Sequence, residues 1–120
     1  MPVTSDAIRG SVILLGNDSA GLPIISASVV IERGGRLKYL VGLDSGDRLV
    51  VAFDDLVNLH DDLAKLHNLR PIGGGWLEID LAQKRLRLSG RSKAYAKEPD
   101  RQLTAGMLRR ALSEFICSAS

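Results

Sequence analysis

The feature that most constrains the fold is the alternation of apolar and polar residues over residues 76–88. This period of two is typical of half-buried strands, and a turn near Ala82 and Gln83 predicts that the segment folds into a hairpin. Its apolar side chains share one face: Leu77, Ile79, Leu81, Leu86 and Leu88. The same register places two opposite-charge pairs across the strands: Asp80 with Arg85 and Glu78 with Arg87. Such pairs stabilise modestly and fix the register.

Four further segments in the first half of the chain predict strands because they are rich in Val, Ile, Leu and Tyr. They cover residues 11–15, 23–32, 37–43 and 47–53. Turn signals separate them: Asn17-Asp18, Gly34-Gly35 and Ser45-Gly46. The last two gaps are short enough for hairpins, so we expect an antiparallel meander.

Two segments predict helices. Residues 54–67 carry leucines at three- and four-residue spacing, with Asp54 or Asp55 as the N-cap. The stripe of that helix is Leu56, Leu59, Leu63 and Leu66, and a Pro- and Gly-rich loop at residues 71–75 follows it. Residues 104–115 predict a second helix, with Thr104 as the N-cap and Leu103 and Leu108 as a hydrophobic staple. Its stripe is Met107, Leu108, Ala111, Leu112 and Phe115.

These elements predict an α+β fold, a mostly antiparallel sheet covered by two helices. A length of 120 residues fits one domain, and 45% hydrophobic with 25% charged residues is the balance of an ordinary globular protein. The lone Cys117 rules out an internal disulfide framework and favours a reducing compartment. The apolar run at residues 11–16 is too short for a signal-peptide core or a membrane span. We therefore expect a cytoplasmic protein with no membrane partner.

Several residues have types suited to anion binding. Glycines 73–75 could bring backbone N–H groups close to a phosphate, although a connector is the simpler interpretation. On a predicted strand over residues 84–93, four basic side chains share one face: Arg85, Arg87, Arg91 and Lys93. Asp80 and Glu78 of the predicted hairpin pair with Arg85 and Arg87. Arg91 and Lys93, on either side of Ser92, are therefore the candidates for a phosphate site. A solvated charged face is the alternative.

His60 and His67 are the two histidines, and both fall on the predicted first helix. Seven residues of helix span roughly 10 Å, too far for both side chains to bind one metal ion. We interpret them as boundary residues beside the apolar stripe. The sequence predicts no metal site and no cofactor.

Three stretches resemble the Janus/Ocnus family of protein phosphohistidine phosphatases. They read GRLKYLV at residues 35–41, DLVNLHDDL at residues 55–63, and GGGWLEIDLAQKRLRLSGRSKAYA at residues 73–96. In that family a triple glycine precedes a strand, and a serine, any residue, alanine and tyrosine follow the next strand at the distance found here. The resemblance covers about residues 23–115. It leaves residues 1–22 as an N-terminal extension, whose role could be an added strand or a homodimer contact.

The resemblance implies a mixed sheet flanked by two helices and a phosphatase that acts on phosphohistidine in proteins without a metal ion. The family binds the phosphoryl group through positions that correspond to Lys38, Gly73, Ser92 and Ala94. Arg91 and Lys93 are additional candidates. The implied partner is a phosphoprotein or a small oxyanion.

The chain departs from the family pattern at the general base, a histidine followed by alanine and then aspartate-isoleucine. Aligning the family's aspartate-isoleucine with Asp55-Leu56 places Phe53 at the histidine position. Aligning the triple glycines without a gap places Val51 there instead. Neither side chain accepts a proton, so the sequence predicts a phosphate-binding protein whose catalytic histidine is replaced.

Two alternatives stay open. The first is an active phosphatase that uses another base, with Asp54 or Asp55 the nearest substitutes. The second is an interaction module whose basic face, formed by Arg87, Arg91 and Lys93, binds an acidic protein or nucleic acid. A net charge of +2 argues against nucleic acid.

Overall fold

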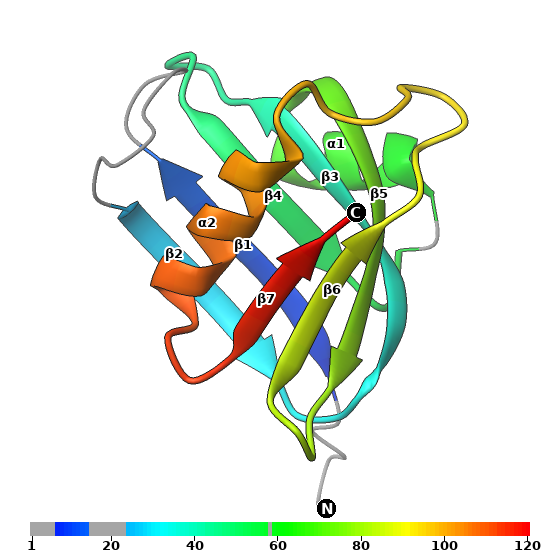
Figure 1. Ribbon diagram of the computed structural model, residues 1–120. Helices are drawn as coiled ribbons and strands as arrows, with labels where there is room; N and C mark the ends of the chain where they lie inside the picture. Colours follow the sequence, from blue (N-terminus) through cyan, green and yellow to red (C-terminus); the bar gives the residue numbers. More distant parts are fainter. Residues whose placement is uncertain (1–6, 15–23, 58) are drawn as a thin grey trace, which may run out of the picture.

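The computed structural model describes residues 7–14, 24–57 and 59–120, and these form one domain in which a curled seven-stranded sheet lies between two helices (Figure 1). The strand order is β2-β1-β4-β3-β5-β6-β7. The strands are β1 (Ile8–Leu14), β2 (Ile24–Ile31), β3 (Gly35–Leu43), β4 (Leu49–Asp54), β5 (Arg70–Asp80), β6 (Arg85–Ser89) and β7 (Ile116–Ala119). The helices are α1 (His60–His67) and α2 (Arg101–Ala111). The α+β prediction is confirmed.

The order of the strands differs from the expected meander. The hairpin at Ser45-Gly46 is confirmed because β3 pairs with β4, but Gly34-Gly35 does not close a hairpin. β1 lies between β2 and β4, so β2 is separated from β3, which pairs with β4 and β5 instead. β1, which lies within the predicted N-terminal extension at residues 1–22, is therefore an interior strand of the sheet. The other residues of that range, apart from Ala7, lie outside the described residues.

Successive side chains of a strand point to opposite faces, and this parity separates two apolar clusters. On β3 and β4 the odd-numbered residues Tyr39, Val41, Val51 and Phe53 join the cluster under α2. The even-numbered residues Leu40, Val50 and Ala52 join the cluster under α1. The two helices therefore cover opposite faces of the sheet.

Helix α1 begins six residues later than predicted, because Asp54 and Asp55 are used elsewhere. Asp54 ends β4 and accepts a hydrogen bond from the Leu56 N–H at 2.9 Å, while Asp55 binds Arg33 at 2.7 Å. The predicted leucine stripe is wrong for three of its four members, since Leu56, Leu59 and Leu66 are 84%, 55% and 57% exposed. The residues that α1 buries are His60, Leu63 and Ala64.

Helix α2 begins three residues earlier than predicted, and its N-cap is Asp100, whose side chain accepts the Leu103 N–H at 3.0 Å. Thr104 lies inside the helix and is buried. The helix ends at Ala111, and β7, which was not predicted, then pairs in parallel with β6. Cys117 on β7 is buried, and this burial raises the pKa of its thiol to about 11.

The hairpin of β5 and β6 is confirmed with the predicted register, in which Glu78 pairs with Arg87 and Asp80 with Arg85. The predicted loop at residues 71–75 is wrong, because all of these residues belong to β5. The predicted strand over residues 84–93 ends at Ser89, since Gly90 adopts a left-handed φ of 66° and turns the chain. Arg91 and Lys93 therefore leave the strand that carries Arg85 and Arg87.

Candidate functional site

The glycine run of β5 brings polar groups close to both faces of the sheet. A Cβ at Gly74 would lie 2.9 Å from Cδ2 of His60, and a Cβ at Gly75 would lie 2.7 Å from an Nη atom of Arg101. A Cβ at Gly73 would overlap the backbone of Glu98. The glycines thus make room for His60 on the α1 face and for the segment 97–101 on the α2 face.

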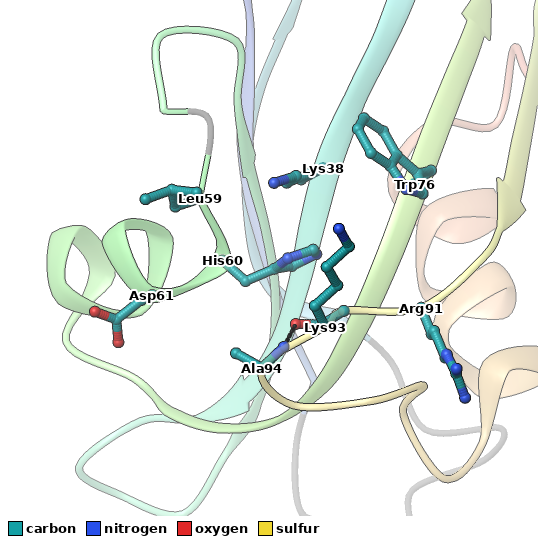
Figure 2. Close-up of a pocket in the computed structure, with 9 residues that line it drawn as sticks. Lys38, Leu59, His60, Asp61, Trp76, Arg91, Lys93 and Ala94 are labelled. Atoms are coloured by element: carbon teal, nitrogen blue, oxygen red, sulfur yellow. Dashed lines mark hydrogen bonds between the residues drawn. The ribbon is translucent and has the colours of Figure 1, made fainter.

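A cavity of about 520 Å³ opens on the α1 face, beside His60 (Figure 2). We call it the histidine cavity. It is lined by Lys38, Leu59, His60, Asp61, Trp76, Arg91, Ser92, Lys93 and Ala94. These residues come from β3, α1, β5 and the loop after β6, and the volume is in the usual range for small-ligand sites.

His60 is the first residue of α1 and is only 6% exposed. Its Nε2 lies 3.1 Å from the carbonyl oxygen of Gly75. A carbonyl can only accept, so Nε2 carries the proton and, in the neutral ring, Nδ1 carries the lone pair. Burial lowers the pKa of His60 below its ordinary value and outweighs the hydrogen bond to Gly75, which raises the pKa, while the nearby Lys38 charge lowers it further. The ring is therefore neutral at neutral pH and able to accept a proton.

Ser92 organises the loop on the other side of the cavity. The Ser92 Oγ accepts the N–H groups of Ala94 at 3.2 Å and of Tyr95 at 3.1 Å. A hydroxyl has two acceptor sites and one proton, so both acceptor sites are used and the O–H is left to donate. The Ser92 N–H donates to the Gly74 carbonyl at 3.1 Å, which fixes the loop to β5.

The charge around the histidine cavity is positive. Lys38, Arg91 and Lys93 line it, and no carboxylate among the described residues forms an ion pair with them. Asp61 is the acidic residue of the lining, and it accepts the Tyr95 hydroxyl at 2.7 Å and the Lys65 ammonium at 3.2 Å. The Tyr95 hydrogen bond and Lys65 lower the pKa of Asp61 and leave its charge compensated.

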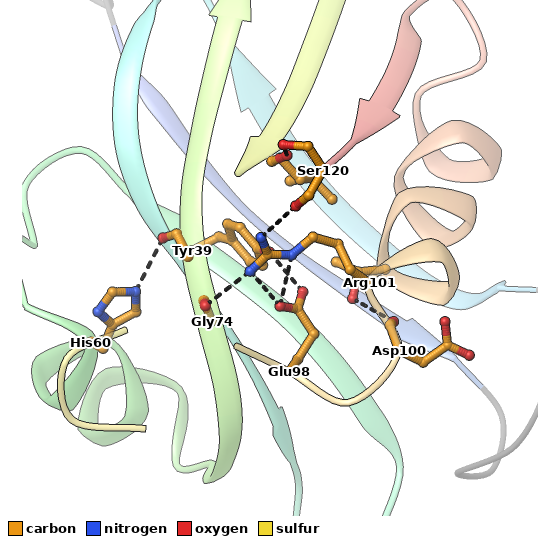
Figure 3. A network of polar contacts seen from close by, with 10 residues as sticks. Tyr39, His60, Gly74, Glu98, Asp100, Arg101 and Ser120 are labelled. Carbon is orange, nitrogen blue, oxygen red and sulfur yellow. Dashed lines mark hydrogen bonds and ion pairs between the residues drawn. The ribbon is translucent and has the colours of Figure 1, made fainter. Parts of the chain in front are cut away.

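A buried ion pair supports β5 from the α2 face (Figure 3). Arg101 donates to Glu98 at 2.8 Å, to the Gly74 carbonyl at 3.2 Å and to the backbone oxygen of Ser120 at 3.0 Å. Glu98 also accepts the Tyr39 hydroxyl at 2.7 Å. Burial raises the pKa of Tyr39 first, and Glu98 adds to that rise, so the phenol keeps its proton. This network fixes β5 at Gly74. The carbonyl of the next residue, Gly75, orients His60.

The structure brings together five of the site residues predicted from the sequence: Lys38, Arg91, Ser92, Lys93 and Ala94. Gly73 is separate from them, because it pairs with Val41 inside β5 and packs against Glu98. Phe53 and Val51 are buried on the α2 face, opposite the cavity. Asp54 and Asp55 line a neighbouring cavity.

Four residues of the cavity lining were not predicted as site residues: Leu59, His60, Asp61 and Trp76. The signal that could have pointed to His60 is His60-Asp61-Asp62-Leu63, which has the histidine and aspartate of the pattern given above, with Asp61 in place of its alanine and Leu63 in place of its isoleucine. The earlier pair Asp55-Leu56 offers the same aspartate-aliphatic anchor. His67 lies at the other end of α1, and its buried Nε2 has no hydrogen-bond partner among the described residues.

Searches for related proteins and for other kinds of site gave little further information. No protein-family model matches the chain, and a search of curated proteins gave no significant match. Over residues 7–14, 24–57 and 59–120 there is no group of three acidic, histidine or cysteine side chains able to hold a metal ion. No helix in the same ranges is long and apolar enough to cross a membrane.

Proposed function

We propose that this chain is a phosphohistidine-phosphatase-like protein that binds a phosphoryl group in the histidine cavity and hydrolyses the P–N bond with His60 as general base. The observation that carries the proposal is the neutral His60 ring in the same cavity as Lys38 and Ser92. The cavity offers a cation, a hydroxyl donor and a proton acceptor, the groups that metal-free hydrolysis of a phosphoryl bond needs.

Each residue has one role in this proposal. Nδ1 of His60 accepts a proton from water while the water oxygen forms a bond to phosphorus. The P–N bond breaks, and its electron pair goes to the imidazole nitrogen of the substrate. The Lys38 ammonium and the Ser92 O–H stabilise the negative charge on the phosphoryl oxygens that do not react. The His60 proton then returns to solvent or to the departing imidazole.

A phosphate-binding protein without turnover is the second candidate. The observation in its favour is that the Ala94 N–H already donates to Ser92 Oγ, which reduces the backbone donors left for a transition state. The two candidates share the anion site and differ only in what His60 does. Substitution of His60 separates them.

The test is hydrolysis of a phosphohistidine-containing peptide by the wild type and by His60→Gln. General-base catalysis contributes about 10² to 10⁴ in rate, so kcat/KM should fall by that factor. Phosphate binding, measured by isothermal titration, should survive in His60→Gln and be lost in a Lys38→Ala, Ser92→Ala double variant. Because the pKa of His60 is lowered from 6.5, the wild-type rate should stay level near neutral pH and fall only below pH 6.5.

The matched control is His67→Gln, which changes the other histidine of α1 outside the cavity. It should leave both kcat/KM and phosphate binding near their wild-type values. Wild-type binding without turnover would favour the second candidate. Equal turnover by wild type and His60→Gln would show that His60 is not the base, and failure of the wild type to bind phosphate would remove both candidates.

A further inference from the structure

The histidine cavity shares lining residues with two neighbouring cavities. It shares Lys38 and Trp76 with a cavity of about 350 Å³. It shares the residues 91–94 with a cavity of about 570 Å³ that extends to Ala96. The three cavities adjoin one another through these shared residues, and His60 lines the central one. We call the three together the basic groove.

The basic groove carries more positive charge than one phosphoryl group needs. Four of its cations have no carboxylate partner among the described residues: Arg36, Lys38, Arg91 and Lys93. A protein-bound phosphate carries about −1.5 to −2 charges near neutral pH, so one such group leaves part of this charge uncompensated.

The acidic residues of the groove do not provide that compensation. Asp55 forms an ion pair with Arg33 at 2.7 Å, and Asp61 binds Tyr95 and Lys65. Asp54 accepts the backbone N–H of Leu56. Their charges are already directed to other partners, so the unpaired cations remain available to an anionic ligand that extends along the groove.

Trp76 holds two of these cations at the centre of the groove. The guanidinium of Arg36 lies 4.1 Å from the indole centroid, and the ammonium of Lys38 lies 5.6 Å from it. Cation–π contacts of this kind orient a positive charge and leave its hydrogen-bond donors free. The indole is therefore used to position cations, which leaves it less suited to stacking a nucleic-acid base.

Residues within 54–57 and 59–61 line the groove with aliphatic side chains as well as with Asp54, Asp55 and Asp61. Leu59 lines the histidine cavity and Val57 lines the neighbouring one. Leu56, next to Val57 in the chain, is 84% exposed. The groove thus offers aliphatic side chains, beside carboxylates that already have partners, together with unpaired cations. A polypeptide that carries both acidic and aliphatic side chains matches both kinds of group, whereas a sugar-phosphate backbone matches only the cations.

We propose that the basic groove docks an acidic polypeptide segment, whose acidic side chains flank the phosphorylated histidine and whose aliphatic side chain contacts Leu56, Val57 or Leu59. This inference rests on the proposed function for the identity of the central residue. The docking itself depends only on the groove. The substrate class is therefore a phosphohistidine in an acidic sequence.

The experiment compares three short fluorescent peptides by anisotropy. All contain one leucine. The first has a non-hydrolysable phosphonate mimic of phosphohistidine between glutamates, the second has the same mimic between glutamines, and the third has alanine between glutamates. Exposed ion pairs each contribute up to about 1 kcal/mol, so two or three new pairs should make the first peptide bind about tenfold more tightly than the second. Added salt should reduce that preference.

The variant is Arg36→Glu, Arg91→Glu, which changes two exposed side chains of the groove. It should abolish the preference of the protein for the first peptide over the second. It should also weaken binding of the third peptide by about tenfold. The matched control is Lys84→Glu, Lys97→Glu, an equal change of charge at exposed positions that line none of the three cavities. It should keep the preference, and circular dichroism should show both variants folded.

The outcomes separate the two proposals. Equal affinity for the first two peptides would overturn the acidic-segment proposal, while turnover of phosphohistidine by the wild type would still support the proposed function. No turnover, together with Arg36- and Arg91-dependent binding of the third peptide, would support the docking surface and remove the catalytic proposal. Tighter binding of a single-stranded oligonucleotide than of the first peptide would overturn the polypeptide assignment.

Discussion

The two helices cover opposite faces of one sheet but are held there by different contacts. Helix α2 begins at a side-chain cap, Asp100, and its first residue, Arg101, forms a buried ion pair. Helix α1 has eight residues and no side-chain cap at Leu59. It buries His60, Leu63 and Ala64 and leaves Leu59 and Leu66 exposed.

This difference indicates that the stability of the fold and the chemistry of the site depend on different faces of the sheet. Elements that bind and react are often drawn from the less strongly anchored parts of a protein. We therefore expect substitutions at the start of α2 to change the free energy of unfolding. Exposed positions of α1 should be nearly neutral in stability.

The largest expected effect is at Arg101. Removing one member of a buried ion pair leaves the other charge without a partner, so Arg101→Ala should lower the free energy of unfolding by about 3–5 kcal/mol. A double variant, Arg101→Met with Glu98→Gln, removes both charges and should lose less than the single variant. Urea denaturation measures both. A loss below about 1 kcal/mol in Arg101→Ala would contradict the comparison between the helices.

A smaller effect is expected at Asp100. Its carboxylate accepts the Leu103 N–H at 3.0 Å, and loss of such an N-cap costs about 1 kcal/mol. Asp100→Ala should therefore lower the melting temperature by several degrees. Gln102→Ala, an exposed change in the same turn, is the control and should leave it nearly unchanged. Equal effects of the two variants would mean that the cap contributes nothing.

The smallest effect is expected at Leu66 of α1. Its side chain is 57% exposed, so Leu66→Gln should change the free energy of unfolding by no more than about 0.5 kcal/mol. Leu63→Ala is the contrasting variant, because Leu63 is fully buried and its truncation leaves a cavity under the helix. Thermal melts of the two variants would settle which face of α1 packs on the sheet. A large loss from Leu66→Gln would restore the leucine stripe predicted from the sequence.

The sequence predicted those parts of the fold that depend on local alternation. Leu77, Ile79, Leu86 and Leu88 alternate with charged residues, and two cross-strand charge pairs left only one register for the hairpin. The first four strands were predicted from another local feature, their high content of Val, Ile, Leu and Tyr. Their order in the sheet was not, because the pairing of β1 with β4 joins segments about 40 residues apart and has no local signal.

The helix boundaries were mispredicted because competing interactions used the expected caps. Asp54 and Asp55 resemble N-cap residues, but a turn N–H and Arg33 occupy their carboxylates. The four residues of β7 directly follow a helical pattern and pair in parallel with β6, so their strand character depends on a distant partner. The glycine run was predicted as a loop because glycine is rare inside strands.

Much of the candidate site could still be assembled from the sequence. Lys38, Ser92 and Ala94 were assigned through motifs of fixed spacing, and the structure gathers them in one cavity. His60 was not, because Asp55-Leu56 and Asp62-Leu63 offer competing anchors in the sequence. What places His60 in the cavity is Gly74, which leaves room for the ring, and the Gly75 carbonyl, which binds it. Both are tertiary contacts across the sheet.

The buried thiol of Cys117 also gives access to the kinetics of β7. A pKa of about 11 leaves very little thiolate at neutral pH, and the side chain is shielded while β7 pairs with β6. Reaction with an alkylating reagent therefore requires β7 to detach, so the labelling rate at high reagent concentration reports how often this strand opens. Because Arg101 donates to the backbone oxygen of Ser120, just after β7, the same rate also reports how often that hydrogen bond opens, without any substitution in the protein.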